Sequence, residues 1–212
     1  MTLPKIEEVA LHSICPEIMA EGGHVLDVGC LGFEFSSEMM RRGFRVSAID
    51  PDPSISLTIV DDQIQFGRVA LVGLGQGGMQ QLARFGNGQG NHLVLPNTQA
   101  PRDAEIVYTT SMDISELMSA FFVGWWECVK LNCEGAEYDI LLSWPGPISK
   151  QISVSFHEHT GANPYRPTSA YYEKMLAHLG RWYIPVRHEI DERYCAGPNY
   201  WSSVFVLKEL CE

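Results

Sequence analysis

Short apolar runs alternate with amphipathic helical segments along most of this chain. The first run, His24–Val28, is typical of a buried strand, and the segment Phe35–Arg42 that follows has the apolar spacing of a helix. Gly43 is a helix stop signal, and Phe44–Asp50 then predicts a second strand. A strand, a helix and a strand in this order form a βαβ unit, in which the two strands run parallel.

The same alternation continues toward the end of the chain. Further strands are predicted at Arg68–Gly73, Glu105–Met112, Trp126–Asn132 and Gln151–His159, and Ile55–Val60 fits either a helix or a strand. Further helices are predicted at Asp113–Phe121, Gly135–Ser143 and Pro167–Gly180. Two closing strands have no helix between them, so we expect them to pair antiparallel. The pattern predicts an α/β fold whose sheet is mainly parallel, with helices on both faces.

Two segments fall outside this alternation, and neither indicates a domain boundary. Residues 1–22 carry acids and His within an apolar pattern, which predicts an N-terminal helical segment that can break at Pro16. Residues 73–97 are rich in Gly, Gln and Asn. Such a composition predicts an insert that forms an exposed hairpin or a mobile loop. We therefore expect residues 1–212 to form one domain.

Composition excludes several classes of partner. The 26 acidic and 15 basic residues give a net charge of -11, whereas proteins that bind the phosphate backbone usually carry a basic patch. Nucleic acid is therefore not the expected partner. No apolar run approaches the roughly 20 residues needed to span a bilayer, and the N-terminus lacks the pattern of a signal peptide. We expect a cytoplasmic protein that acts on a small molecule; the sequence does not indicate its oligomeric state.

The turn after the first strand contains two glycines and leads directly into a helix. Gly29 and Gly32 stand where glycines let the backbone approach a ligand closely, next to the free N–H groups of the helix start. Asp50 ends the second strand, 21 residues after Gly29. An acid at about 20 residues binds the ribose hydroxyls of a nucleotide cofactor. A tight turn without a ligand, and a local capping role for Asp50, remain the alternatives.

The charges near this turn distinguish two classes of cofactor. NAD sites prefer G-x-G-x-x-G, because a pyrophosphate lies against the start of the helix. Here the third glycine is absent, and Glu34 would place a carboxylate beside that pyrophosphate. S-adenosylmethionine carries a ribose, a cationic sulfonium and an amino-acid end, but no phosphate. Asp27, at the end of the first strand, could attract the sulfonium directly or through water. The sequence therefore favours S-adenosylmethionine over NAD.

Several motifs resemble those of known methyltransferases. The stretch VLDVGCLGFEFS, followed by AIDPDP, resembles the first two motifs of class I methyltransferases. The stretch VKLNCEGAEYDIL, with SVSFHEH after it, is similar to the signature of the FkbM-type family. The matching residues are Lys130, Glu134, Gly135 and Glu137. TTSMDISEL resembles the segment that leads into this signature, with Asp113 as the matching acid.

This resemblance implies a fold, an activity and a cofactor site. The fold is a single Rossmann-like domain with a seven-stranded, mainly parallel sheet and an antiparallel C-terminal strand. The activity is transfer of a methyl group from S-adenosylmethionine to a hydroxyl of a sugar, a natural product or another small metabolite. The predicted cofactor-binding residues are Asp27, Gly29, Cys30, Gly32, Asp50, Pro51 and Asp113. No metal ligand is predicted, because the spacing of the histidines is not diagnostic of a metal site.

Three polar residues at predicted strand ends are candidates for catalysis. Methyl transfer to oxygen requires a positioned acceptor and often a base. His157 is the first choice for the base, because an imidazole titrates near neutral pH. Glu134 could be the base or orient it, although an acid at a helix start also interacts with free amides. Asn132, which stands where the family usually has Asp, could hold the acceptor or the methionine part of the cofactor.

Two other functions stay open on the sequence alone. One is an NAD-dependent oxidoreductase or epimerase, which the glycine spacing disfavours. The other is a catalytically idle cofactor-binding protein, which the change from Asp to Asn132 keeps open.

Overall fold

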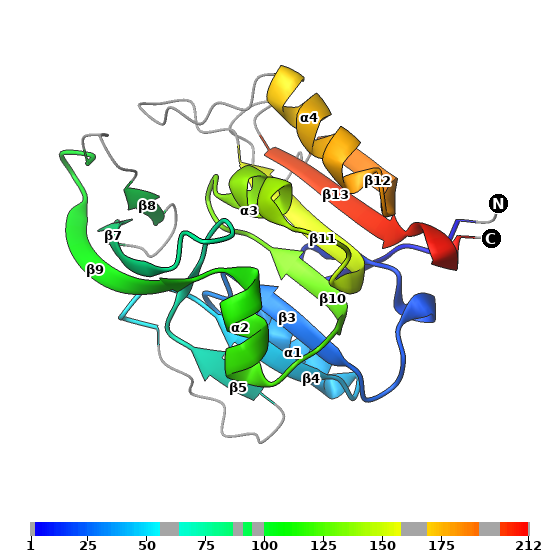
Figure 1. Ribbon diagram of the computed structural model, residues 1–212. Helices are drawn as coiled ribbons and strands as arrows, with labels where there is room; N and C mark the ends of the chain where they lie inside the picture. Colours follow the sequence, from blue (N-terminus) through cyan, green and yellow to red (C-terminus); the bar gives the residue numbers. More distant parts are fainter. Residues whose placement is uncertain are drawn as a thin grey trace.

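A seven-stranded sheet forms the centre of the protein (Figure 1). The computed structural model describes residues 3–55, 64–86, 91–94, 100–157, 169–190 and 200–211. In spatial order, the strands are β12 (Tyr183–Ile190), β13 (Tyr200–Leu207), β11 (Ser149–His157), β10 (Trp126–Leu131), β3 (His24–Val28), β4 (Arg45–Ile49) and β5 (Ile64–Gly67). All neighbours from β11 to β5 pair parallel, whereas β13 pairs antiparallel with both β11 and β12. The prediction of a mainly parallel sheet with an antiparallel C-terminal strand is confirmed.

The strand order reverses between β3 and β10. From β3 the sheet grows through β4 to β5, and the chain then returns to add β10 and β11 on the other side of β3. In open α/β sheets, ligands bind beyond the carboxyl ends of the strands at such a switch point. The glycine turn that follows β3 therefore lies where a ligand is expected.

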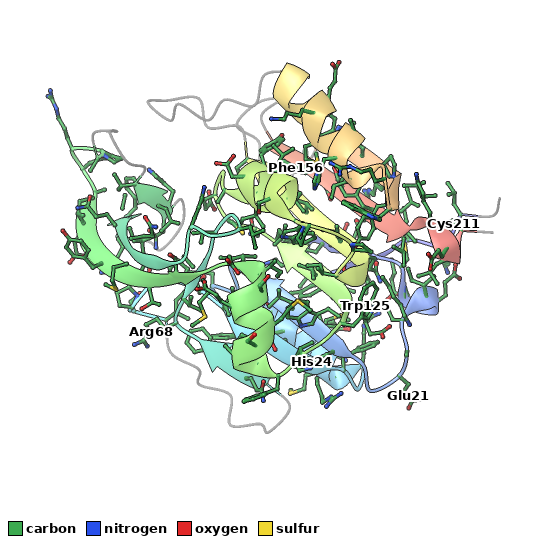
Figure 2. The ribbon with its side chains drawn as sticks, in the orientation of Figure 1. Glu21, His24, Arg68, Trp125, Phe156 and Cys211 are labelled. Atoms are coloured by element: carbon green, nitrogen blue, oxygen red, sulfur yellow. The ribbon has the colours of Figure 1, made fainter. Side chains whose placement is uncertain are left out.

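Described helices cover both faces of the sheet, as the sequence pattern predicted. On one face, α1 (Glu34–Arg41) packs Phe35 and Met39 against Val25 of β3 and Val46 of β4. The other face carries α2 (Ile114–Phe121), α3 (Glu137–Ser143) and α4 (Ser169–Leu179). Buried Phe156, labelled in Figure 2, lies on that face, where its ring is 4.7 Å from the ring of Tyr138 on α3.

The helical segment predicted for residues 1–22 is wrong. The chain instead forms a hairpin of β1 (Glu7–Val9) and β2 (His12–Ile14), followed by a 3-10 turn at Pro16–Ile18. The backbone N–H of Cys15 donates to Gln151 Oε1 at 2.7 Å, and Gln151 Nε2 donates to the Cys15 carbonyl at 3.0 Å. These long-range bonds fix an extended backbone that a local apolar pattern cannot reveal.

A second sheet takes two of its four strands from the predicted insert. Its strands, in spatial order, are β6 (Ala70–Leu71), β9 (Glu105–Met112), β7 (Gly78–Arg84) and β8 (His92–Val94). Because β7 and β8 pair antiparallel, the hairpin interpretation of residues 73–97 is confirmed for its described part. The predicted strand at Arg68–Gly73 is reduced to β6, and β5 takes the place at the edge of the main sheet.

Some predictions fall partly outside the described residues. The segment Ile55–Val60 is described only at Ile55. The predicted strand that ends at His159 is described to His157, and the predicted helix that starts at Pro167 is described from Ser169. The assignment of residues 1–212 to one domain stays a prediction. Among the helices described, none has the length and apolar character to cross a bilayer.

Candidate functional site

The glycine turn crosses the end of β10 in close contact. Gly29 has φ +73°, and a Cβ at this position would overlap the backbone carbonyl of Asn132. The Asn132 N–H in turn donates to the Val28 carbonyl at 3.1 Å. Only glycine satisfies both the left-handed backbone and the close approach. The structure thus brings together Gly29 and Asn132, two residues that the sequence analysis placed in the site.

Asp50 holds this turn from the end of β4. Its Oδ2 accepts the Leu31 N–H at 3.2 Å, and its Oδ1 accepts the Asp52 N–H at 3.0 Å. Burial raises the pKa of the Asp50 carboxyl, while these amide hydrogen bonds and Lys130 oppose the rise. Each carboxylate oxygen can accept a further hydrogen bond, so the geometry leaves Asp50 able to receive ribose hydroxyls.

Asp27 forms a buried ion pair that the sequence analysis did not predict. Its side chain is fully buried, Ser36 Oγ donates to Oδ2 at 2.6 Å, and Lys130 Nζ lies 2.9 Å from Oδ1. Lys130 also donates to the carbonyls of Val28 at 3.2 Å and Gly29 at 2.8 Å. The negative charge of Asp27 is therefore balanced by Lys130 within the fold. Whether Asp27 also attracts a sulfonium stays a prediction.

Lys130 is a structural residue of the site whose role the sequence analysis missed. It tethers the end of β3 and the glycine turn through the contacts described above. The signal was present: Lys130 lies inside an apolar strand and pairs in register with Asp27 of the neighbouring strand. A buried ammonium requires a partner of opposite charge, and the adjacent buried acid is the nearest choice.

Three other predicted cofactor residues contribute through their backbone or through packing. The Cys30 side chain lies in the core beside Phe33, and burial raises the pKa of its thiol. At Gly32, a Cβ would overlap the carboxylate of Glu34, which folds back over the turn. The Pro51 carbonyl accepts Thr109 Oγ1 from β9 at 3.3 Å. Whether any of them touches a cofactor stays a prediction.

Asp113 is the N-cap of α2. Its Oδ1 accepts the N–H groups of Ser115 at 2.8 Å and Glu116 at 3.0 Å, and its Oδ2 accepts the Gly75 N–H at 2.8 Å. These bonds, that from Gly75 first, lower the pKa of the Asp113 carboxyl. Glu116 Oε2 accepts the Asp113 N–H at 2.8 Å, which completes a capping box. The carboxylate is used for folding, so its predicted contact with a cofactor gains no support.

A buried carboxylate orients His157 at the end of β11. Glu137 Oε1 accepts from His157 Nδ1 at 2.9 Å and from the Cys133 N–H at 2.7 Å, and its Oε2 accepts the Gly135 N–H at 2.9 Å. His157 Nε2 faces Glu134, 3.9 Å from Oε1. Burial favours the neutral ring, but the charges of Glu137 and Glu134 outweigh it and raise the pKa of His157.

Glu137 is thus a second residue whose role the sequence analysis missed, although it matched the family signature. This role could have been predicted from its position in the first turn of α3. A carboxylate there can accept hydrogen bonds from the backbone N–H groups of the preceding turn. The structure does bring together His157 and Glu134, as their predicted positions on neighbouring strand ends implied.

Two features of the turn after β10 point to a ligand. Glu134 has φ 53°, and non-glycine residues with left-handed backbone are uncommon and cluster at functional sites. Asn132 Oδ1 is buried and has no hydrogen-bond partner among the described residues. A buried acceptor without a partner costs free energy, so a ligand that donates to it would bind favourably.

A small hollow of about 70 Å³ lies between this turn and the second sheet. Its walls come from the loop after β6, from β8 and from the start of α3; they include Val72, Gln76, His92, Leu93, Glu134 and Asp139. The second sheet therefore forms one side of the candidate site. The described residues contain no group of three His, Cys, Asp or Glu side chains that could hold a metal ion, and the lack of a metal stays a prediction.

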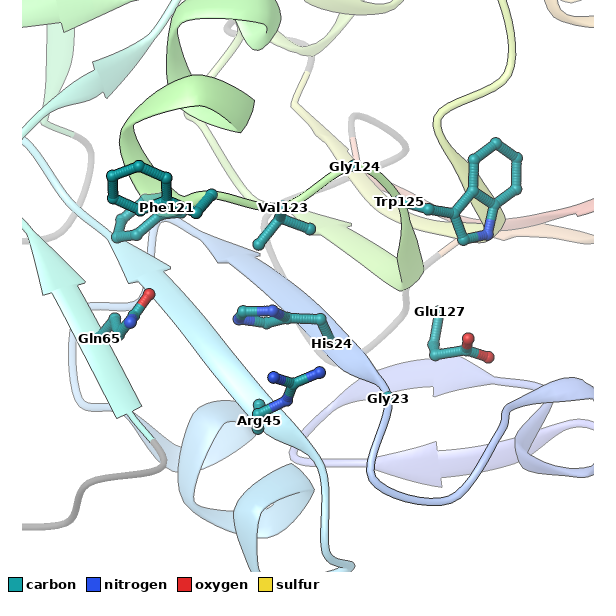
Figure 3. A pocket seen from close by; sticks show the side chains of 10 residues that line it. Gly23, His24, Arg45, Gln65, Phe121, Val123, Gly124, Trp125 and Glu127 are labelled. Atoms are coloured by element: carbon teal, nitrogen blue, oxygen red, sulfur yellow. The ribbon is translucent and has the colours of Figure 1, made fainter.

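A larger cavity, of about 520 Å³, lies at the amino edge of the main sheet, that is, at the ends of the strands opposite to the candidate site (Figure 3). It opens at the amino ends of β3, β4 and β10, where His24, Arg45 and Glu127 line it. None of the residues predicted for the cofactor or for catalysis contributes to it. It is therefore a separate feature from the candidate site.

Comparison with known proteins finds similarity at the level of solved structures. No protein-family model and no curated protein matches the chain, so the resemblance to the FkbM-type family is not confirmed. A TehB-like SAM-dependent methyltransferase from Corynebacterium glutamicum shares 12% identity, with a TM-score of 0.42 over 91% of this chain and 84% of that one.

Two further solved structures give similar values. The 1,6-didemethyltoxoflavin-N1-methyltransferase of Burkholderia thailandensis, crystallised with bound 1,6-didemethyltoxoflavin and S-adenosylhomocysteine, shares 13% identity. Its TM-score is 0.47 over 88% of this chain and 72% of that one. A putative S-adenosylmethionine-dependent methyltransferase from Listeria monocytogenes shares 11% identity, with a TM-score of 0.47 over 91% and 95% of the two chains. We draw no functional conclusion from similarities this low.

Proposed function

We propose that this chain is an S-adenosylmethionine-dependent methyltransferase that acts on a hydroxyl of a sugar or another small metabolite. The observation that carries the proposal is the junction of Gly29, Asp50 and Asn132 at the switch point of the sheet. There a glycine turn, a carboxylate and a buried amide oxygen that has no hydrogen-bond partner among the described residues meet in one place. The resemblance of the residues around Glu134 to the FkbM-type signature supports the same assignment.

The charge at the turn favours a cofactor without phosphate. The carboxylate of Glu34 lies over Gly32, at the start of α1. A pyrophosphate at that helix start would meet this negative charge instead of free amides alone. The arrangement therefore disfavours NAD, and with it the oxidoreductase alternative.

The residues present fit the parts of S-adenosylmethionine. Asp50 would hold the ribose hydroxyls, and Asn132 Oδ1 would accept from the amino group of the methionine part. The backbone at Gly29 would allow close approach. The cofactor supplies a methyl group on a positively charged sulfur, which makes that methyl electrophilic.

His157 is the residue that we assign to removal of the acceptor's proton. Its Nδ1 proton is directed to Glu137, which fixes the tautomer and turns Nε2 toward Glu134 and the site. Because the pKa of His157 is raised, the ring must first lose its extra proton before Nε2 can act as a base. Glu134 would orient the acceptor hydroxyl toward Nε2.

Binding of the product cofactor tests this proposal directly. Isothermal titration should show that the wild-type chain binds adenosylhomocysteine and does not bind NAD. The Asp50→Asn variant should bind adenosylhomocysteine more weakly by about 1.5–3 kcal/mol, the contribution of hydrogen bonds to a charged group. Asp103→Asn, at an exposed position, is the matched control and should bind as the wild type does. Tight binding of NAD, or equal affinity in Asp50→Asn, would contradict the assignment.

A further inference from the structure

The cavity at the amino edge of the sheet has the size and lining of a ligand site. Its volume of about 520 Å³ lies within the range of roughly 300–1,000 Å³ typical of small-molecule pockets. The strands β3, β4, β5 and β10 and the segment after α2 all contribute to it, as Figure 3 shows. The residues used below are His24, Arg45, Gln65, Phe122, Trp125 and Glu127.

Phe122 adopts an unfavourable backbone conformation and gains no burial from it. It follows α2 with φ 55°, and the Val123 N–H donates to the Met118 carbonyl at 3.0 Å, which closes the helix end. Glycine is the usual residue at such a left-handed helix end, because other side chains are disfavoured there. Yet the Phe122 side chain is 96% exposed. The ring contributes little to the packing of the fold, so a ligand is the better explanation for its presence.

A second exposed aromatic residue, Trp125, lies three positions along the chain and lines the same cavity. It is 39% exposed, whereas the adjacent Trp126 is fully buried in the core. Two accessible rings beside one cavity offer flat apolar surface, which favours a planar ligand.

The polar groups of the cavity leave one positive charge unbalanced. The Arg45 residue is exposed, and its side chain forms no ion pair or hydrogen bond with any part of the chain that the structure describes. Glu127 is already engaged, because its Oε2 accepts the Ala20 N–H at 2.7 Å and lies 2.7 Å from Lys150 Nζ. Burial and the neighbouring Arg45 lower the pKa of His24, which favours the neutral ring. Arg45 therefore favours an anionic ligand.

We propose that this cavity binds a small planar aromatic anion, with its ring against Phe122 and Trp125 and its carboxylate or sulfonate on Arg45. Gln65 would donate a further hydrogen bond from its side-chain amide. The site goes beyond the proposed function, because it lies at the opposite edge of the sheet from Asp50 and His157. A protein partner would require a larger surface, on the order of 1,000 Å² or more.

Two naphthyl probes, one anionic and one neutral, test the proposal. Isothermal titration of the full chain should show that 2-naphthoate binds about tenfold or more tightly than 2-naphthalenemethanol, since hydrogen bonds to a charged group supply that difference. Arg45→Gln should abolish the preference. Arg41→Gln is the control, because Arg41 lies on the exposed side of α1 and, among the described residues, pairs with Glu38 alone. Equal binding of the two probes to the wild type would overturn the proposal.

Phe122→Gly separates a binding role from a structural one. Glycine suits the left-handed backbone, so the variant should unfold at the same temperature as the wild type or at a higher one. Its affinity for 2-naphthoate should nevertheless fall about 2–10-fold, the effect expected for the loss of one aromatic contact. Unchanged affinity in this variant would overturn the proposal. So would displacement of 2-naphthoate by adenosylhomocysteine, because it would place the probe at the carboxyl edge.

Discussion

The two edges of the central sheet, at the carboxyl and the amino ends of its strands, differ in whether their charged side chains are buried and paired. At the carboxyl edge, Asp27 pairs with Lys130 and Glu137 with His157, and all four side chains are almost completely buried. At the amino edge, Arg45 faces an open cavity without a described partner. Buried pairs hold their geometry before a ligand arrives, which suits chemistry, because preorganised polar groups need not rearrange during reaction. An unpaired cation in an open cavity suits reversible binding.

The largest expected effect concerns His157 at the carboxyl edge. His157→Ala should lose about 10²–10⁴-fold in turnover, the usual contribution of a general base, while the affinity for adenosylhomocysteine stays near that of the wild type. Turnover is measured as release of adenosylhomocysteine with an acceptor found by screening sugars and small alcohols. His178→Ala is the control, because it also removes an imidazole, one that forms a hydrogen bond with the Trp144 carbonyl and is not part of the candidate site. Full activity in His157→Ala would remove this residue from the mechanism; lost cofactor binding would show that it builds the pocket instead.

The next prediction compares the free energy of unfolding after removal of Lys130, which has an ion-pair partner, and of Arg45, which has no described partner. Lys130→Met should lower the free energy of unfolding by about 3–5 kcal/mol, because it leaves Asp27 buried without its partner. Arg45→Met should change it by no more than about 0.5 kcal/mol, since that cation has no described partner to lose. Chemical denaturation measures both values. Equal effects of the two substitutions would refute the contrast between the edges.

A smaller effect should come from the second sheet, through its contact with the turn after β4. Arg84 Nε donates to the buried Asp52 Oδ1 at 3.0 Å, two residues after Asp50, and Arg84 also pairs with exposed Glu105. Arg84→Met should weaken adenosylhomocysteine binding by about 0.5–2 kcal/mol, the size reported for residues that act through a packed network. Glu105→Gln removes only the exposed pair and should leave the affinity unchanged. The same loss in both variants would mean that Asp52 does not transmit the effect.

The last prediction concerns how the free energy of unfolding and the turnover change with pH. Because the folded state raises the pKa of His157, its stabilising contribution is complete below about pH 6.5, the value for the unfolded chain. That contribution is lost as pH rises through the higher folded value. The unfolding free energy should therefore fall over this window, while turnover rises as His157 loses its proton. Denaturation at a series of pH values should show this slope in the wild type, and His157→Gln should lack it.

The sequence predicted the parts of the site that depend on order along the chain. Strand ends and the turns after them are visible in an apolar pattern, so the glycine turn, Asp50, Glu134 and His157 were all placed near one edge. The contacts that define their chemistry are not visible in that pattern. Glu137 holds His157 across 20 residues, and the pairing of Asp27 with Lys130 depends on the register of two strands.

Contacts between residues far apart in the sequence also explain the errors in the predicted fold. Residues 1–22 have a helical apolar pattern. In the structure, however, the backbone of Cys15, which follows β2, forms two hydrogen bonds with the Gln151 side chain of the main sheet. The strand Glu105–Met112 was predicted correctly, yet it pairs with β6 and with β7 of the insert, and not with strands of the main sheet. Asp113 caps α2, because the free N–H groups of a helix start are the nearest donors.

The bonds between Cys15 and Gln151 have a consequence for the order of folding. They join residues 136 positions apart, and Cys15 also packs against Val204 and Val206 near the end of the chain. Contacts of such long sequence separation form late, because the entropy of closing the intervening loop must be overcome first. During synthesis, the hairpin of β1 and β2 can therefore dock only after β11 and β13 have left the ribosome. In native-state hydrogen exchange, the Cys15 amide should thus report the docking of this hairpin on β11 and β13.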